Sequence, residues 1–230
     1  MKTVGLIGGM SYSSTITYYE KLNKLTSDHF GDLTTPKILL SSVNFAEIEK
    51  LQHENDWDKL GQIMNEEAHL LSSSGAEVLA LCTNTMHKLE EAMLNGIETN
   101  FIHIANPTAK KIKDSGYSKP ALLATKFTME EDFYISKLKE YSLDPIVPSS
   151  EDREILHSII YDELCFNVLK DESRRLFIQI VENVKLLGAD SVILGCTEVG
   201  LLLNSDNSSL PVFDTVDLHC EAIIQNILFN

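Results

Sequence analysis

Two stretches of the chain, GAEVLALCTN at residues 75–84 and GADSVILGCTE at residues 188–198, follow the same plan. Each starts with a helix-ending glycine, continues through alanine and an acid into a short apolar run, and ends on Cys-Thr and a polar residue. The two cysteines, Cys82 and Cys196, are 114 positions apart in a chain of 230 residues. The echo predicts two similar halves, each presenting one cysteine at an equivalent strand end. Chance similarity between two ordinary βα units is the alternative.

Short apolar runs alternate with amphipathic stretches along the whole chain, which is typical of βαβ units around parallel sheets. We expect strands at residues 3–7, 37–43, 78–81, 121–124, 191–194 and 212–213, and the main helices at 11–26, 56–73, 150–169 and 171–187. The predicted fold is α/β, with two Rossmann-like domains related by pseudo-symmetry. The N-terminal domain, residues 1–105 plus 208–230, carries Cys82, and the second domain, residues 106–207, carries Cys196.

The composition indicates a small-molecule partner. A net charge of −15 repels phosphate backbones and anionic lipids, so we expect neither nucleic-acid nor membrane binding. No apolar stretch approaches the roughly 20 residues of a membrane span, and the first residues do not form a signal peptide. The four cysteines lack C-x-x-C spacing, which suits free thiols in a reducing compartment. We therefore expect a cytoplasmic protein.

Both Cys-Thr pairs follow predicted strands, at the edge of a parallel sheet where ligands bind. A thiol at a helix N-terminus should have a pKa below its usual value of about 8.5 and could act as a base. One such cysteine is more often inert packing, but two in matching contexts favour catalysis. The chemistry that needs both is stereoinversion at an acidic C–H, with a base on one face and an acid on the other. The neighbouring Thr and Asn side chains could equally cap the next helix.

The loop GGMS at residues 8–11 follows the first predicted strand. Its glycines could let the backbone approach an anion, and an ordinary tight turn is the alternative. It does not match G-x-G-x-x-G, which disfavours a dinucleotide cofactor. Metal binding is also disfavoured, because Cys82 with His87, or His219 with Cys220, lacks a complete ligand set. His103 is expected to pack near a strand end, with a place in the pocket as the alternative.

Five motifs together resemble the aspartate/glutamate racemase superfamily, in particular its aspartate-racemase branch with broad-specificity amino-acid racemases. They are GLIGGMS at residues 5–11, LCTNTMH at 81–87, LAT at 123–125 with Thr128-Met129, GCTE at 195–198 and PVFDT at 211–215. The resemblance implies an active site in the cleft between two domains, a homodimer, and racemisation without pyridoxal phosphate, metal or other cofactor. It also implies that Cys82 and Cys196 are the acid/base thiols. The pocket positions it implies are Met10, Ser11, Thr83, Asn84, Thr85, Thr125, Thr197 and Glu198.

Departures from the family pattern leave the substrate open between aspartate, glutamate and a small polar amino acid. Glutamate racemases carry Asp-Ser in the first loop and Cys-Thr-His in the second motif, whereas this chain has Met10-Ser11 and Cys196-Thr197-Glu198. Aspartate-specific members hold the distal carboxylate with basic side chains, where this chain has Gln52, which could bind a hydroxyl or amide equally well. A cysteine-dependent decarboxylase or hydrolase, and a non-catalytic amino-acid-binding relative, are the alternative functions.

Overall fold

The chain forms two compact units. The computed structural model describes residues 1–31 and 33–229; Asp32 and Asn230, the last residue of the predicted N-terminal domain, lie outside the described residues. Unit 1 comprises residues 1–103 and 219–230, and unit 2 comprises residues 104–218. Each unit is built around its own parallel sheet. The predicted α/β class with parallel sheets is confirmed.

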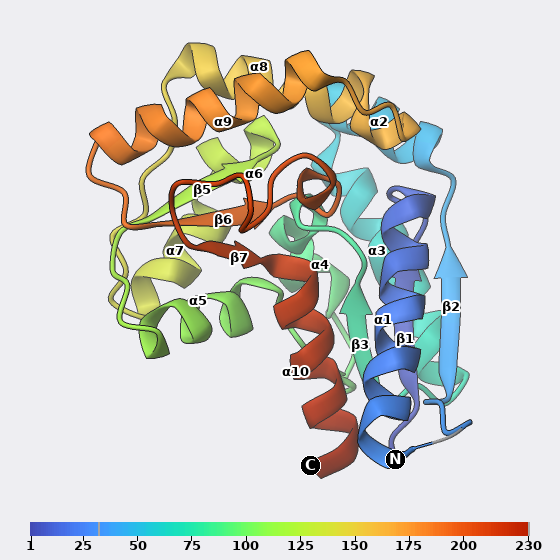
Figure 1. Ribbon diagram of the computed structural model, residues 1–230. Coiled ribbons are helices and arrows are strands. Elements are labelled where there is room, and N and C mark those ends of the chain that lie inside the picture. The colour runs from blue at the N-terminus through green and yellow to red at the C-terminus, as the bar shows by residue number, and fades with distance from the viewer. Residues whose placement is uncertain (32, 230) are drawn as a thin grey trace. The chain divides into compact units, whose positions relative to one another are not determined.

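The sheet of unit 1 has the order β2-β1-β3-β4. Its strands are β1 (Val4–Gly8), β2 (Ile38–Ser42), β3 (Val78–Leu81) and β4 (Asn100–Phe101). Strands β1 and β3 are buried throughout, because helices cover both faces of the sheet. In Figure 1, α1 and α10 lie in front of these strands and α3 lies behind them. The helices are α1 (Tyr12–Phe30), α2 (Phe45–His53), α3 (Trp57–Ser73), α4 (Glu90–Met93) and the later part of α10 (Thr215–Phe229), with the 3₁₀ helix η1 (Thr85–Leu89).

The sheet of unit 2 has the order β5-β6-β7, and an isolated parallel bridge joins Ile146 to the free side of β5. Its strands are β5 (Pro120–Ala124), β6 (Ser191–Gly195) and β7 (Val212–Asp214). Figure 1 shows α8 and α9 on one side of this sheet and α5 and α7 on the other. The helices are α5 (Ala105–Asp114), α6 (Lys126–Glu130), α7 (Asp132–Glu140), α8 (Ser150–Asp162) and α9 (Asp171–Leu186), with the 3₁₀ helices η2 (Leu164–Phe166) and η3 (Val199–Leu201).

Local sequence signals explain where the longer helices begin and end. The side chain of Asp56 caps α3 by accepting from the N–H of Lys59, and Ser149 caps α8 by accepting from the N–H of Asp152. The turns that follow α3 and α9 need a left-handed residue, which Gly75 (φ 97°) and Gly188 (φ 98°) supply. These two glycines open the repeated segments, so each cysteine strand starts from the same kind of turn.

The chain passes between the units at different residues from those predicted. Ile104 and Ala105, expected in the first domain, pack in the core of unit 2. The return to unit 1 comes at His219 instead of residue 208, because β7 pairs with β6 in the register Val192↔Val212 and so belongs to the second sheet. A strand as short as 212–214, preceded by an irregular loop, does not reveal its pairing partner in the sequence.

Candidate active site

Cys82 follows β3 directly, at the carboxyl end of a strand inside its sheet. Its backbone N–H donates to the carbonyl oxygen of Ile7 at 2.9 Å, and its carbonyl oxygen accepts from Ser14 Oγ at 2.7 Å. The side chain is fully buried. Strand β1 and the first turn of α1 therefore both hold the backbone that carries this thiol.

The structure brings the beginning of α1 and the end of α2 to the same region of unit 1 as the Cys82 loop. Ser11 caps α1, with its Oγ accepting from the N–H of Ser14 at 3.3 Å. Gln52, near the end of α2, donates from Nε2 to Sδ of Met86 at 3.3 Å. The predicted site residues of unit 1 besides Cys82 are all buried: Met10, Ser11, Gln52, Thr83, Asn84 and Thr85.

Gly9 serves the turn itself rather than an anion. Its N–H donates to Thr15 Oγ1 at 2.8 Å, so that donor is already engaged. Its φ is 91°, and a Cβ there would lie 2.4 Å from the carbonyl oxygen of Val43. The loop after β1 therefore needs glycine for its own packing against the segment after β2. Of the two sequence interpretations, the tight turn is the one that this geometry supports.

Three buried histidines pack together in unit 1. The ring centroid of His87 lies 4.6 Å from that of His103 and 5.8 Å from that of His219. Burial, with the two neighbouring rings, lowers the pKa of His87 well below its usual value, and burial lowers the pKa of His219 to about 4. His219 Nε2 lies 2.8 Å from the carbonyl oxygen of Ile102, and its Nδ1 lies 2.7 Å from the hydroxyl of Tyr18. In the neutral ring, Nε2 therefore donates and Nδ1 accepts.

Cys196 follows β6 in unit 2 and is only partly buried. Its Sγ donates to Oε2 of Glu198 at 3.1 Å, and the hydroxyl of Thr197 donates to the same oxygen. Glu198 is almost fully buried, with 4% of its surface exposed. The predicted residues Cys196, Thr197 and Glu198 therefore form one hydrogen-bonded group.

Thr125 follows β5, the strand next to β6. The register pairs Ala124 with Gly195, so Thr125 and Cys196 each come directly after a paired residue at the same edge of the sheet. The hydroxyl of Thr125 lies 3.2 Å from that of Thr128, and the side chain is buried. The second unit thus collects its predicted site residues at the carboxyl ends of two adjacent strands.

Both thiols have a raised pKa, whereas the sequence predicted lowered values. Burial raises the pKa of Cys82. For Cys196, burial comes first, the negative charge of Glu198 adds to it, and the N–H of Glu198 opposes it. The elements that follow the two cysteines are the short 3₁₀ helices η1 and η3, which do not carry the macrodipole of a long α-helix. Both cysteines are therefore protonated thiols in the free protein near neutral pH.

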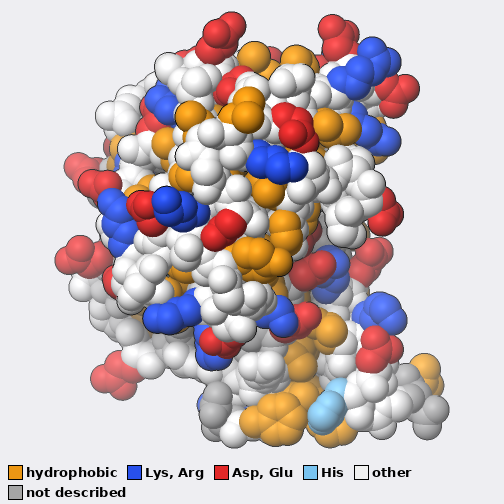
Figure 2. All heavy atoms as spheres, turned by 60° about the vertical axis from the view of Figure 1, so that its left-hand side comes forward, with side chains coloured by type: hydrophobic (Ala, Val, Ile, Leu, Met, Phe, Trp, Pro, Cys, Tyr) orange, Lys and Arg blue, Asp and Glu red, His pale blue; other side chains and the backbone are white. Residues whose placement is uncertain are grey.

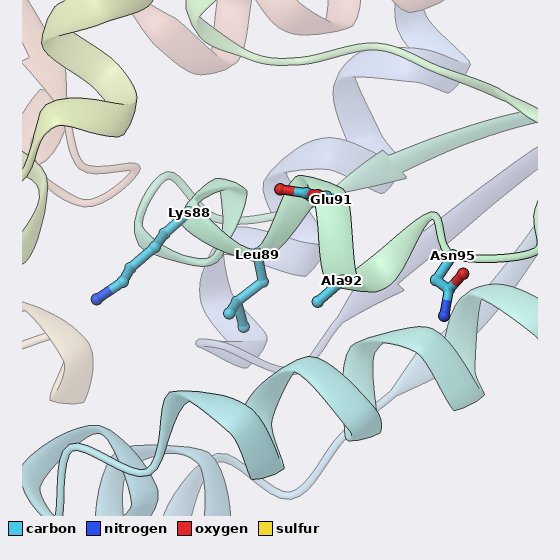
Figure 3. A pocket seen from close by; sticks show the side chains of 5 residues that line it. All are labelled: Lys88, Leu89, Glu91, Ala92 and Asn95. Carbon is cyan, nitrogen blue, oxygen red and sulfur yellow. The ribbon is translucent and has the colours of Figure 1, made fainter.

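Other features of the described residues are not part of this site. No group of three or more His, Cys, Asp or Glu among them could hold a metal ion, and no described helix is long and apolar enough to cross a membrane. Acidic and basic side chains are mixed on the face shown in Figure 2. An open hollow of about 540 Å³ on η1 and α4 (Figure 3) is lined by Lys88, Leu89, Glu91, Ala92 and Asn95, none of which is a predicted site residue.

Comparison with known proteins identifies the family. The sequence model of the Asp/Glu/hydantoin racemase family matches residues 7–223. The chain belongs to this family. It is on that basis an isomerase of the racemase type, and the resemblance seen in the sequence is confirmed.

Individual relatives cover nearly the whole chain. The broad-specificity amino-acid racemase RacX of Bacillus subtilis is 21% identical over 225 residues, 92% of either protein. The solved structure of a candidate Asp/Glu racemase from Yersinia pestis has a TM-score of 0.91 and 41% identity, covering 99% of this chain and 100% of its own. An aspartate racemase homologue from Pyrococcus horikoshii has a TM-score of 0.84 and 33% identity, covering 99% of both chains. This family's α/β fold with parallel sheets is therefore the fold of the chain.

Sequence reasoning missed two groups beside the cysteines. Ser14, which binds the Cys82 carbonyl, lies one helical turn after the capping Ser11, so the spacing of the two serines was a usable signal. Cys165 on η2 interacts electrostatically with Cys196 and Glu198. It lies far from both in the sequence, and no motif surrounds it. Its position depends on how α8 and η2 pack in unit 2.

Proposed function

We propose that the chain is a cofactor-independent racemase that interconverts L- and D-amino acids, with Cys82 and Cys196 as its two acid/base groups. The observation that carries the proposal is the correspondence of the two cysteines. Each follows the strand next to the first strand of its sheet, at the carboxyl edge, within a repeated sequence segment. Membership of a racemase family supports the reaction class.

The proposed reaction is a 1,1-proton transfer. The thiolate of one cysteine removes the α-proton, the electron pair left on the α-carbon delocalises into the substrate carboxylate, and the thiol of the other cysteine protonates the opposite face. Two residues on opposite faces are needed because a single base would return the proton to the face it came from. A positioned acid or base of this kind typically adds about 10²- to 10⁴-fold to the rate.

The raised pKa values of the thiols fit this chemistry when substrate is bound. The α-ammonium group of an amino acid is a positive charge, and a positive charge within about 4 to 6 Å of a thiol favours the thiolate. Burial keeps both thiols protonated until that charge arrives. We propose that Thr83, Asn84 and Thr85 from one unit, and Thr125 and Thr197 from the other, bind the polar groups of the substrate.

The decisive experiment follows the α-proton signal of amino acids by NMR in D₂O. We expect wild-type protein to replace the α-proton with deuterium while it racemises a substrate. Cys82→Ser and Cys196→Ser should each lower racemisation by at least about 10²-fold. Cys220→Ser is the matched control, because it makes the same change at a buried thiol outside both Cys-Thr motifs. Normal racemisation in either of the first two variants would refute the proposal.

Assays for CO₂ release and protein mass spectrometry, run beside the NMR measurement, separate the alternative functions. A decarboxylase would release CO₂, and a cysteine hydrolase would accumulate a covalent acyl-enzyme. A non-catalytic relative would bind an amino acid without any exchange of its α-proton. Each of these outcomes would replace the racemase proposal with a different function for the same two cysteines.

We propose aspartate, glutamate or a small polar amino acid as the substrate, with Gln52 near its side chain. The names of the relatives support this range, since they include aspartate racemase homologues and a broad-specificity amino-acid racemase. Gln52→Leu should then raise KM for the best polar substrate by about 2- to 13-fold, the value of one neutral hydrogen bond. If Gln52→Leu leaves KM unchanged for every amino acid tested, Gln52 does not contact the substrate.

We also propose that the two units act as domains with the substrate between them, and that the protein works as a homodimer in the cytoplasm. The four free cysteines fit a reducing compartment. One face of α1 exposes the apolar side chains of Tyr12, Ile16 and Tyr19, which would suit contact with a second copy. Sedimentation of wild type and Ile16→Lys tests this: a dimer that the substitution dissociates supports the proposal, and a wild-type monomer contradicts it.

A further inference from the structure

The two cysteines differ in the charges that face them. Burial raises the pKa of Cys82, and no charged group among the described residues adds to that effect. Burial also raises the pKa of the partly exposed Cys196, and this thiol faces in addition the carboxylate of Glu198 and the thiol of Cys165. A carboxylate disfavours a nearby thiolate and accepts a hydrogen bond from the neutral thiol, so both effects raise the thiol pKa. The two cysteines therefore follow equivalent strands of their sheets but have different charged neighbours.

Glu198 is held where it can act on Cys196. Its Oε2 accepts two hydrogen bonds, from Cys196 Sγ at 3.1 Å and from the hydroxyl of Thr197. Two donors that converge on one oxygen match an ionised carboxylate, which has only acceptors. With 4% of its surface exposed, Glu198 is poorly screened by solvent. Its charge therefore acts on the sulfur at close range.

Other polar groups near this loop have different partners or weaker effects. Cys165 is half-buried, and burial together with Glu198 raises its pKa to about 12, so it is a neutral thiol near pH 7. The carboxylate of Asp214, at the end of β7, accepts from the backbone N–H groups of Val216 and Asp217 at the start of α10. Glu198 is thus the charged side chain that hydrogen-bonds to the Cys196 sulfur.

We propose that Glu198 is a positioning residue that holds Cys196 as the protonated thiol, so that, once substrate is bound, Cys82 is the thiolate that removes a proton and Cys196 is the thiol that donates one. This rests on the proposed racemase function. When the pair has lost one proton, the remaining proton stays on the sulfur that faces Glu198. Glu198 in this role acts through Cys196 and need not touch the substrate.

The proton and electron balance of one turnover follows from this arrangement. The Cys82 thiolate forms an S–H bond with the α-proton, and the C–H electron pair stays on the substrate. The S–H bond of Cys196 then breaks: its proton joins the opposite face of the α-carbon, and its electron pair stays on the Cys196 sulfur. That thiolate faces the like charge of Glu198, so the proton that Cys82 has gained passes to the Cys196 sulfur, directly or through water, which leaves Cys82 as the thiolate and Cys196 as the thiol for the next substrate.

The first test measures the Cys196 thiol without any substrate. Wild type, Glu198→Gln and Glu198→Asp are alkylated with iodoacetamide over a range of pH, and the modified cysteines are quantified by peptide mass spectrometry. We expect Glu198→Gln to move the Cys196 profile to lower pH, with about tenfold faster alkylation near neutral pH for each unit of pKa. Glu198→Asp, which keeps the charge, should stay near wild type, and Cys82 should keep its profile in all three.

The outcome of this test is unambiguous in either direction. A Cys196 profile that is unchanged or moves to higher pH in Glu198→Gln would overturn the proposal. A merely structural role would perturb Gln and Asp alike, or Cys82 together with Cys196. Circular dichroism of the three proteins identifies a variant that has not folded. If Glu198→Gln does not fold, Thr197→Val takes its place beside Glu198→Asp, because it removes the hydrogen bond from Thr197 to the Glu198 carboxylate. The alkylation profile of Cys196 must then shift while that of Cys82 does not.

The second test uses the pH profile of kcat/KM for racemisation. The rising limb belongs to the first thiol to lose its proton and the falling limb to the second. Glu198→Gln should move the falling limb to lower pH and leave the rising limb in place, and Glu198→Asp should restore it. Movement of the rising limb alone would assign Glu198 to the other step and overturn the proposal. If no racemisation occurs at all, the proposed function fails, while the alkylation result still decides the relation of Glu198 to Cys196.

Discussion

The sheets of the two units share one strand order but surround their cysteines differently. In unit 1, β3 lies between β1 and β4, with β2 on the far side of β1; in unit 2, β6 lies between β5 and β7, with the Ile146 bridge on the far side of β5. The cysteine strand thus has the same neighbours in both. Backbone hydrogen bonds to Ile7 and Ser14 hold the Cys82 residue, whereas the Cys196 sulfur faces a carboxylate. A repeated fold can therefore give one reaction two non-equivalent acid/base groups.

The largest expected effect comes from removing one of the two cysteines, which separates the proton transfers that each performs. In Cys196→Ser the remaining Cys82 should exchange the α-proton of one enantiomer with solvent deuterium, and in Cys82→Ser the remaining Cys196 should exchange that of the other. Neither variant should invert its substrate, because the opposite face lacks a proton donor. NMR in D₂O with pure L- and D-substrates measures both rates. Exchange of the same enantiomer by both variants would mean that the cysteines do not face opposite sides.

The pH dependence of the rate should reflect the raised pKa of both thiols. The active pair needs one thiolate, and burial raises the pKa of Cys82 and Cys196. Racemisation should therefore increase from about pH 7 towards about pH 9, by about tenfold per pH unit on the rising limb. Initial rates in a constant-ionic-strength buffer series provide the measurement. A kcat/KM that is already flat from pH 6 to pH 8 would show that a thiolate exists in the free enzyme, because kcat/KM reports the free enzyme, and would contradict this environment for the thiols.

Acid should destabilise the protein through the buried histidines of unit 1. His219 has a folded-state pKa of about 4 against an ordinary 6.5, so the unfolded chain binds its proton first. Stability that is complete above about pH 6.5 is therefore lost as the pH falls towards 4, by about 1.4 kcal/mol per pH unit for each such histidine. Urea unfolding at several pH values should give a shallower pH slope for His219→Phe than for wild type. Equal slopes would show that His219 is not protonated on unfolding.

The smallest effect tests how alike the two repeated segments are. Gly75 and Gly188 have φ values of 97° and 98°, and an added Cβ would meet nothing within 4 Å at either. Gly75→Ala and Gly188→Ala should each cost about 1 to 2 kcal/mol, from backbone strain alone. Chemical denaturation of the two variants should give matching values. A clear difference between the two values would show that the turns at Gly75 and Gly188 are not equivalent.

The elements that the sequence predicts well are those with strong local signals. β3 lies at the predicted residues 78–81, and α9 begins at Asp171 as predicted, because buried apolar runs and amphipathic periods are bounded there by glycine or acidic residues. β4 was not predicted, since Asn100–Phe101 is too short to show a period. The change of unit at His219 was also missed, because long-range packing of α10 decides it.

The chemistry of the site was less predictable than its location. Both cysteines lie at strand ends, as the repeated segment indicates. The direction of their pKa shifts depends on burial and on Glu198, which a linear pattern does not weigh against each other. The role of Gly9 likewise depends on a contact with Val43, 34 positions away. Local patterns identify reactive residue types, while their protonation is a property of the packed protein.

The two crossings between the units bear on how the protein is made. Unit 1 includes residues from His219 onward, and His219 links the carbonyl of Ile102 to the hydroxyl of Tyr18. During synthesis these partners leave the ribosome long before His219 does, since all of unit 2 is translated in between. At typical translation rates that interval lasts roughly ten seconds. During this interval the surface of unit 1 that α10 later covers is exposed. A chaperone or another nascent chain can then bind next to the sheet that carries Cys82.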